Sequence, residues 1–279
     1  MTQLPEVEVI RKDLEREVVG KRFKEVHVNT ASMVGRHRNR PDFCKALEGQ
    51  KIESVGRRGT LLVFEFDNAN ALVVRLGPEA LLTRETATEE PGENNQVVAT
   101  FTTGGALHLV DAAKSSELYV IEQSEIHELK ELNATGIDPL ADTFTWQAFA
   151  GELKTRQTRL KKLFVDESFI IGLGDLYSDE ILWTAGLAGT RVSNTLSSQE
   201  VRRLYRAIFE VLYEAGKQGG TSAGARGEHT DLFGEPGEYG SFLNVFDMEG
   251  RACSRCRRQI HRTRLERDLY SFHCEGCQT

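Results

Sequence analysis

Four cysteines near the end of the chain constrain its fold more than any other feature of the sequence. They form two Cys-x2-Cys pairs, Cys253 with Cys256 and Cys274 with Cys277, and residues 257–273 separate the pairs. Two such turns at the open end of a β-hairpin hold four sulfur atoms in a tetrahedron, which is the arrangement of a zinc ribbon. Because four thiolates leave no ligand position for water, we expect one structural Zn2+ ion.

A pair of disulfides is the alternative interpretation of these cysteines. It is disfavoured, because the sequence shows no secretory signal and because the cysteines within one Cys-x2-Cys turn are poorly placed to bridge each other. The fifth cysteine, Cys44, is expected to be a small core residue and not a metal ligand.

The composition indicates a soluble globular protein of about two domains. Of the 279 residues, 39% are hydrophobic and 28% are charged, so the chain can bury a large core. No stretch approaches the ~18 consecutive apolar residues of a membrane-spanning helix. We therefore expect a monomer in the cytoplasm, with no membrane partner.

The net charge of -7 argues weakly against a nucleic-acid partner, but the charges are unevenly distributed. Acidic residues gather at 85–93 and 122–131, whereas basic residues gather at 36–40, 154–162 and 251–267. For any one basic group, a solvated surface is the simpler interpretation. Three such groups on an acidic chain favour a surface that faces phosphates.

Hydrophobic periodicity predicts a helix over residues 4–19, followed by a β-sandwich. Alternating or apolar runs predict strands at 61–66, 71–76, 97–103, 106–110 and 117–121. The polar residues 84–95 are expected to form a mobile loop.

From residue 126 onward the periodicity is helical. We expect helices at 145–153, 156–166, 174–186 and 198–216. The glycine-rich run from 216 to 240 is expected to be a long mobile loop. These patterns predict an α+β fold with three domains, at residues 1–125, 126–240 and 241–279.

Three further motifs precede the cysteine ribbon in a fixed order. They are Leu-Pro-Glu-Val-Glu at 4–8, Arg-Arg-Gly at 57–59, and Gly-Leu-Gly-Asp-Leu-Tyr-Ser-Asp-Glu at 172–180. With the ribbon, they resemble the formamidopyrimidine-DNA glycosylase and endonuclease VIII (Fpg/Nei) family over essentially the whole chain. The resemblance implies a β-sandwich domain, a helix-two-turns-helix (H2TH) domain and a zinc hairpin that bind damaged DNA in base excision repair, at the nucleoid if the organism is bacterial.

The resemblance also implies which residues touch DNA. Gly172 and Gly174 match a glycine pair whose backbone approaches a phosphate, and Lys161 matches a phosphate-binding lysine. The arginine of the zinc hairpin corresponds best to Arg267, although Arg264 stays an alternative.

Two more DNA contacts implied by the resemblance lie at or near positions where this chain departs from the family pattern. Arg75 begins the loop that would probe the duplex, and Pro78 stands where the family has a void-filling methionine. Asp175 replaces an asparagine, and its carboxylate would repel a phosphate unless a cation pairs with it.

The residues expected to carry the chemistry depart from the family pattern. The resemblance implies that residue 2, usually a proline whose α-amine is free after removal of Met1, attacks C1′ of the sugar while a glutamate at residue 3 handles protons. This chain has Thr2 and Gln3. A threonine α-amine with a pKa near ~8 is partly neutral at pH 7 and nucleophilic. An amide cannot exchange protons in this range. Glu6 is the nearest carboxylate that could replace the glutamate, unless it only favours the start of the helix.

Further positions have also changed. Thr60 replaces a lysine expected near the phosphates, and Ala113 and Ser115 replace the arginine and phenylalanine of an Asp-x-Arg-x-Phe motif that fills the hole left by a flipped base. Changes at several separate sites indicate natural divergence.

Three hypotheses follow from these residues. The favoured one is a protein that binds damaged or abasic DNA and whose base-excision activity is weak or lost. An alternative is an active glycosylase or abasic-site lyase that uses the Thr2 α-amine as a Schiff-base nucleophile. A third is a protein-interaction module. The residues leave open whether the chain is still an enzyme, and the segment at 221–237 does not reveal which lesion is recognised.

Overall fold

The computed structural model describes residues 2–86, 92–129, 136–222 and 229–279. Contacts between residues divide them into two compact units. The first unit holds the described residues up to 129 and those between Gln218 and Gly240, and the second holds residues 136–217 and 241–279. The three-domain division expected from the sequence stays a prediction.

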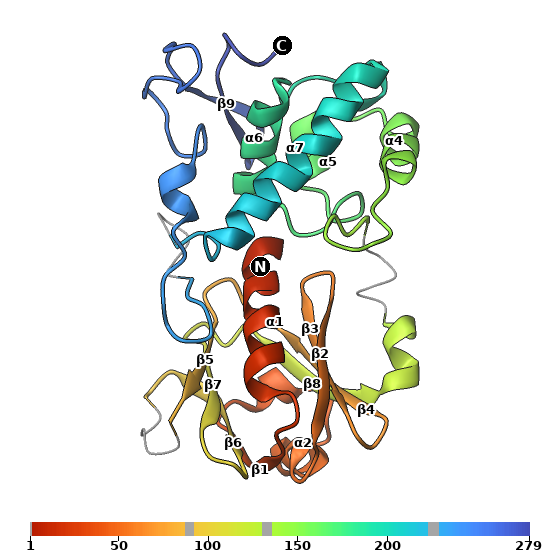
Figure 1. Cartoon of the computed structure of the whole chain (residues 1–279), viewed down its shortest axis with the longest axis vertical. Helices are drawn as coiled ribbons and strands as arrows, with labels where there is room; N and C mark the ends of the chain where they lie inside the picture. Colours follow the sequence, from red (N-terminus) through yellow and green to blue (C-terminus); the bar gives the residue numbers. More distant parts are fainter. Residues whose placement is uncertain (1, 87–91, 130–135, 223–228) are drawn as a thin grey trace. The chain divides into compact units, whose positions relative to one another are not determined.

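The first unit contains two four-stranded antiparallel sheets, with strand orders β1-β6-β7-β5 and β2-β3-β4-β8 (Figure 1). In chain order its elements are α1 (Leu4–Val18), β1 (Phe23–Val28), η1 (Ala31–Val34), α2 (Arg40–Leu47), β2 (Ile52–Arg58), β3 (Leu61–Phe66), β4 (Asn70–Arg75), β5 (Leu81–Glu85), β6 (Asn95–Phe101), β7 (Ala106–Val110), β8 (Glu117–Glu122) and η2 (Gln123–Glu128). The predicted helix followed by a β-sandwich is confirmed.

Helix α1 is fixed to this sandwich by its apolar face. It begins at Leu4, and Pro5 suits the first turn because that position needs no backbone N–H. Val7, Ile10 and Leu14 recur at helical spacing and are buried in one core cluster with residues of both sheets. Burial of one such side chain contributes about 1.5–3 kcal/mol. The start of the chain is therefore held in place by the core of the first unit.

The predicted loop at 84–95 is wrong at both of its ends. Arg84 and Glu85 belong to β5, which pairs with β7, and Asn95 begins β6. Strand pairing satisfies the backbone groups of this segment whatever the polarity of its side chains. The middle of the predicted loop, at 87–91, lies outside the described residues.

The predicted mobile loop at 216–240 is structured where it is described. Thr221 forms a β-bridge with Glu238, and Leu232 is completely buried in the core of the first unit. The Leu232 carbonyl accepts a 2.7 Å hydrogen bond from the Arg84 N–H of β5. The segment is thus paired with itself at Thr221 and Glu238 and joined to the sandwich at Leu232, while residues 223–228 lie outside the described part of the chain.

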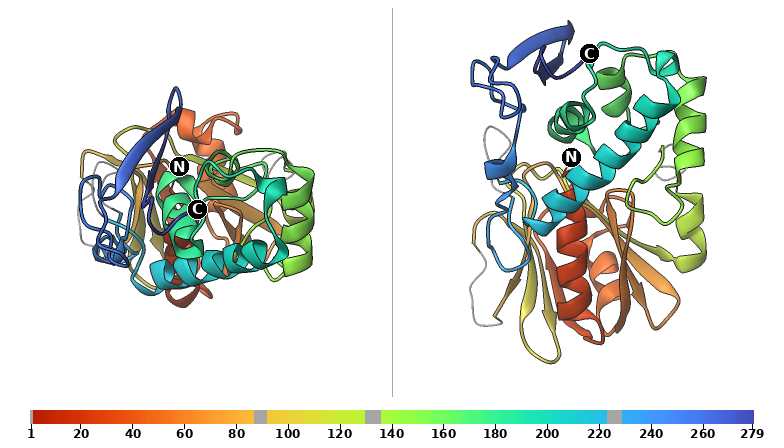
Figure 2. Two further views of the ribbon diagram at one scale, coloured as in Figure 1. Left: turned by 90° about the horizontal axis from the view of Figure 1, so that it is seen from above. Right: turned by 45° about the horizontal axis from the view of Figure 1, so that its top comes forward.

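The second unit consists of helices and a two-stranded hairpin. Its elements are α4 (Trp146–Thr155), α5 (Leu160–Phe164), α6 (Gly174–Ala185), η3 (Ser193–Thr195), α7 (Ser198–Lys217), β9 (His261–Glu266) and β10 (Leu269–His273), while η4 (Tyr239–Phe242) lies where the chain passes between the units. The hairpin is the dark blue pair of strands in Figure 2. No helix among the described residues is both long and apolar enough to cross a membrane.

The predicted helix at 156–166 is shorter than expected. Only Leu160–Phe164 is helical, because Arg159 has an extended backbone and forms a β-bridge with Val192. This bridge holds the start of α5 against the segment before η3.

A partly buried histidine, His37, ties the segment after η1 to strand β8. The N–H of Val120 donates a 3.0 Å hydrogen bond to Nε2 of His37, so this nitrogen must be unprotonated. The His37 ring packs edge-on against Phe43 of α2. Burial lowers the pKa of His37 from its ordinary value of 6.5, although Asp42, 3.9 Å away, acts in the opposite direction.

This arrangement predicts a pH-dependent stability. Because the folded pKa of His37 lies below its unfolded value, its contribution is complete above about pH 6.5 and is lost as the pH falls toward the folded pKa. His37→Gln, which can still accept the Val120 N–H, should therefore lose less free energy of unfolding between about pH 8 and about pH 5 than the unmodified protein does. Urea unfolding across this range measures the difference, and parallel losses would contradict the assignment.

Candidate functional site

The residue expected to supply the nucleophile is buried and held by its hydroxyl group. Thr2 is 9% exposed, and its Oγ1 donates a 2.9 Å hydrogen bond to the carbonyl of Gly77. Gln3 is the N-cap of α1 but makes no capping bond with its side chain. The structure thus places residue 2 against the loop between β4 and β5.

A hydrogen-bonded chain continues from Gly77 to a buried carboxylate. The Gly77 N–H donates to Ser116 Oγ at 2.9 Å, and Ser116 Oγ donates to Asp111 Oδ2 at 2.7 Å. Asp111 is completely buried and also accepts the backbone N–H groups of Ser115 and Ser116. Ser116 was not predicted from the sequence, where its only signal is a hydroxyl close to Asp111 in the altered motif.

Glu6, the carboxylate one helical turn after Thr2, holds the segment that begins at Gln218. Its Oε1 accepts the Thr221 N–H at 2.9 Å, and the side chain is buried. A Cβ atom at Gly220, where φ is +82°, would lie 2.9 Å from Cγ of Glu6, so only glycine allows this close approach. The observed role of Glu6 is an anchor, and its role in proton transfer stays a prediction.

The Arg-Arg-Gly motif contributes an internal ion pair. Arg57 of β2 is mostly buried, and its Nε lies 3.1 Å from Oε2 of Glu8 in α1. Burial tends to raise the pKa of Glu8, but hydrogen bonds and ion pairs with Arg11 and Arg57 lower it overall. Arg57 therefore links α1 to the sheet, and Thr60 follows it in the turn to β3.

Arg75, a predicted DNA contact, shares a carboxylate with a second arginine. Its guanidinium lies 3.2 Å from Glu117, which also binds Arg36 at 2.9 Å. Arg36 stacks over the ring of Tyr119 at 3.7 Å. Arg75 is half-exposed, and its contact with DNA stays a prediction.

Lys161 of α5 lies in the interior of the second unit. Its side chain is completely buried, with Nζ 2.9 Å from Oδ1 of Asp179 and 2.8 Å from Oγ of Ser178. Asp179 in turn accepts hydrogen bonds from Ser271 Oγ and from the Phe272 N–H of β10. The ammonium group is thus directed at protein partners, and the phosphate contact of Lys161 stays a prediction.

The glycine pair before α6 has the expected backbone. Gly172 and Gly174 adopt φ values of +67° and +55°, which other residues rarely adopt. Asp175 follows in the first turn of α6, half-exposed, with Oδ1 3.7 Å from Nζ of Lys161. A cation therefore stands beside the Asp175 carboxylate, which is the condition under which a phosphate could approach.

The two candidate arginines of the β9–β10 hairpin differ in their surroundings. Arg264 of β9 is exposed and donates to the carbonyls of Glu266 and Arg267, so it braces the turn. Arg267 lies in the turn itself and is exposed, with no side-chain partner among the described residues. Arg267 is the more available of the two for an outside anion.

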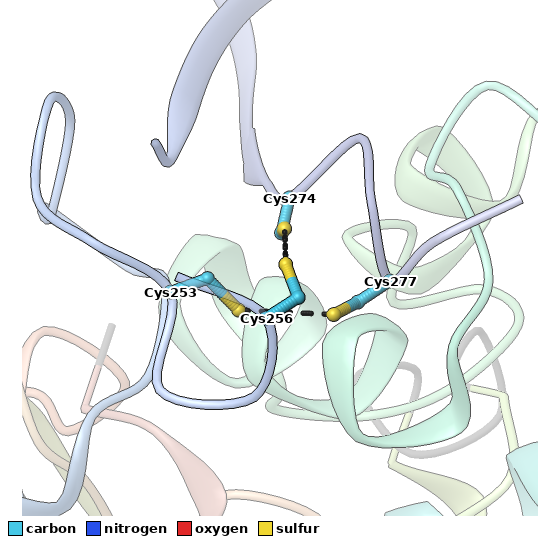
Figure 3. Close-up of side chains that lie close together, drawn as sticks. All are labelled: Cys253, Cys256, Cys274 and Cys277. Carbon is cyan, nitrogen blue, oxygen red and sulfur yellow. Dashed lines mark hydrogen bonds between the residues drawn. The ribbon is translucent and has the colours of Figure 1, made fainter. Parts of the chain in front are cut away.

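The four cysteines converge at the base of this hairpin (Figure 3). All four sulfur atoms lie within 4.8 Å of one another, with Cys253 and Cys277 at 3.8 Å and Cys256 and Cys274 at 3.3 Å. Metal–sulfur bonds of about 2.3 Å in a tetrahedron place sulfur atoms about 3.8 Å apart, so the cluster could hold one metal ion. Burial and then the neighbouring sulfur atoms raise the pKa of Cys277 to about 12, because thiolates so close together need a cation between them.

Comparisons with known proteins agree with these features. Residues 1–118 match the formamidopyrimidine-DNA glycosylase N-terminal domain, and residues 135–226 match the formamidopyrimidine-DNA glycosylase H2TH domain. The chain is 31% identical over 278 residues to formamidopyrimidine-DNA glycosylase of Pelotomaculum thermopropionicum, covering 100% of this chain and 99% of the relative. It is 33% identical over 281 residues to that of Enterococcus faecalis, covering 100% and 97%.

Solved structures of Fpg and MutM bound to DNA also superpose on this chain. The complex between Lactococcus lactis Fpg and DNA containing an abasic site superposes with a TM-score of 0.88, at 26% identity and with 99% of each chain covered. A structure of MutM in complex with DNA containing carbocyclic 8-oxo-G superposes with a TM-score of 0.86, at 26% identity and the same coverage.

The buried ion pair predicts a large difference between two adjacent lysines. Lys161→Met leaves Asp179 buried without its cation and should lower the free energy of unfolding by about 3–5 kcal/mol. Lys162→Met removes an exposed pair with Glu266 and should cost about 0–1 kcal/mol. Denaturant unfolding of the two variants provides the comparison, and equal losses would show that the pair at Lys161 is not important for stability.

The cysteine cluster predicts one bound metal ion per chain. Cys256→Ser should lose the metal and lower the melting temperature, because metal binding by such sites contributes on the order of 10 kcal/mol at pH 7. Cys44→Ser, at the cysteine far from the cluster in sequence, should keep the metal. Elemental analysis of both purified variants and thermal unfolding with and without a chelator measure the effect. Unchanged metal content in Cys256→Ser would exclude this site.

Proposed function

Because this chain belongs to the formamidopyrimidine-DNA glycosylase family, we propose that it binds damaged or abasic DNA while its base-excision activity is weak or lost. The observation that carries the proposal is Gln3, an amide at the position where the family pattern has its proton-transferring glutamate. Loss of a general acid or base typically lowers a rate by about 10²- to 10⁴-fold.

DNA binding is supported by the groups that would contact a backbone. The Gly172–Gly174 turn has the left-handed conformation that allows close approach, and Arg267 is exposed at the tip of the hairpin. The solved relatives that superpose on the whole chain are complexes with abasic or lesion-containing DNA.

Weak excision is supported by the loop that would replace a flipped base. Residues 112–115 offer only Ala112, Ala113, Lys114 and Ser115, and none of these is an aromatic or branched apolar wedge. A Cβ atom at Gly77 would lie 2.0 Å from Ser115 Oγ, so the loop packs closely on Gly77 and a side chain at 77 would force Ser115 to move.

A second candidate function is lyase activity at abasic sites through the α-amine of Thr2. The observation that favours it is the hydrogen bond from Thr2 to Gly77, which holds residue 2 in a defined place even though proline is absent. An abasic site has no base to protonate or extrude, so the loss at Ser115 matters less for this reaction, while Gln3 affects only the later removal of a proton from C2′ of the sugar.

For the cysteine cluster, we propose one structural Zn2+ ion. Four thiolates in a closed tetrahedral arrangement suit zinc and leave no site for water or substrate.

Binding assays with duplexes that carry no lesion, an oxidised base or an abasic site test the proposed function. We expect the tightest binding to abasic DNA and little release of the oxidised base. Arg264→Ala/Arg267→Ala should weaken binding and reduce the salt slope by roughly 0.9 for each phosphate that these arginines neutralise.

The matched control is Lys12→Ala/Lys24→Ala, which removes two exposed positive charges from α1 and β1. If both double variants behave alike, the hairpin does not meet DNA and serves another partner. Absence of binding to every DNA at low salt would exclude the proposed function altogether.

A further inference from the structure

Residue 2 carries a hydroxyl group next to its backbone nitrogen, and the structure fixes this hydroxyl. Thr2 Oγ1 donates its hydrogen to the Gly77 carbonyl at 2.9 Å, so the oxygen lone pairs point away from Gly77. A hydroxyl that donates a hydrogen bond is also a better electron donor through its oxygen. The family's proline at this position has no such group.

The rest of the network holds Gly77 in place. Ser116 Oγ accepts the Gly77 N–H and donates to Asp111, whose carboxylate is completely buried and bound by two backbone N–H groups. Thr2 is therefore the outer end of a rigid polar chain that starts in the interior of the first unit. Asp111 and Ser116 are positioning residues for it.

An amine with a hydroxyl on the adjacent carbon reacts with an aldehyde in two steps. In the first step the nitrogen attacks the aldehyde carbon, water leaves, and a C=N bond forms. In the second step the hydroxyl oxygen adds to that carbon, a C–O bond forms, and the hydroxyl proton moves to nitrogen. The product is a five-membered oxazolidine ring, and the sequence of steps needs no oxidant or reductant.

We propose that Thr2 captures the aldehyde of an abasic site in DNA as an oxazolidine, so that the protein forms a lasting covalent cap on the site. The ring would contain N, Cα, Cβ and Oγ1 of Thr2 and C1′ of the sugar. This inference rests on the second candidate function, because it needs abasic DNA at the Thr2 amine, and it requires removal of Met1.

The neighbouring residue favours capture over strand cleavage. Cleavage from the imine requires a base to remove a proton from C2′ of the sugar, and the Gln3 amide cannot do so. Ring closure by Oγ1 meanwhile removes the C=N bond on which cleavage depends. Gln3 thus slows strand cleavage, and the hydroxyl of Thr2 makes ring closure possible.

The test uses the full-length protein and a duplex with a natural, aldehydic abasic site, without borohydride. We expect an adduct that survives a denaturing gel, with a mass equal to protein without Met1 plus DNA minus one water. Thr2→Ser, which keeps the amine and the hydroxyl, should form the same adduct. Thr2→Ala, which keeps only the amine, should lose it and be trapped only when borohydride is added.

A duplex with the tetrahydrofuran analogue, which has no aldehyde, separates this inference from the proposed function. All three proteins should bind it without cross-linking. Binding to the analogue with no borohydride-independent adduct, or equal adducts from Thr2→Ala and the unmodified protein, would overturn oxazolidine capture alone. Retention of Met1 in the purified protein would also overturn it. Failure to bind the analogue and every other duplex would remove both proposals together.

Discussion

Two adjacent carboxylates on α6 organise the second unit. Asp179 and Glu180 are completely buried, and burial raises the pKa of each, so their ionised forms depend on the donors around them. Glu180 accepts the backbone N–H groups of residues 244–246, while Asp179 binds β10 and Lys161. These two residues of α6 therefore hold three segments in place: residues 244–246, which precede the first cysteine pair, β10, which precedes the second, and α5, which carries Lys161. The cysteine cluster is assembled on this helix and not on the hairpin alone.

The first unit also contains a buried carboxylate, Asp111, that organises the residues around it. Oδ2 of Asp111 accepts two backbone N–H groups and the Ser116 hydroxyl, while its buried Oδ1 has no hydrogen-bond partner among the described residues. Ser116 in turn accepts the Gly77 N–H, and the Gly77 carbonyl accepts the Thr2 hydroxyl. A buried acceptor with good partners rigidifies its surroundings, because every alternative arrangement leaves a charge unsatisfied. The position of Thr2 is thus set from the interior, in addition to the apolar anchoring of α1.

Features that depend on local spacing could be predicted from the sequence. The family, the fold class and the cysteine cluster follow from short motifs in order, and the comparisons and the structure confirm them. Elements with few buried residues escaped prediction, such as β1 and α2, because their periodicity is weak. The environment of Lys161 could not be predicted from the sequence either, since its partner Asp179 lies on another helix.

The polar network at Thr2 was equally hidden, because one of its links is the backbone of Gly77, which carries no side-chain signal. Its composition nevertheless bears on how the chain diverged. Where the family pattern has proline and phenylalanine, this chain has Thr2, which is buried, and Ser115, which is exposed on one side and lies against Gly77. A buried hydroxyl without a partner costs about 1–3 kcal/mol. The hydroxyl of Thr2 is bonded, and Ser115 packs against Gly77 while its N–H binds Asp111. The two substituted residues therefore both contact Gly77, and residue 2 has a defined position without the proline of the family pattern.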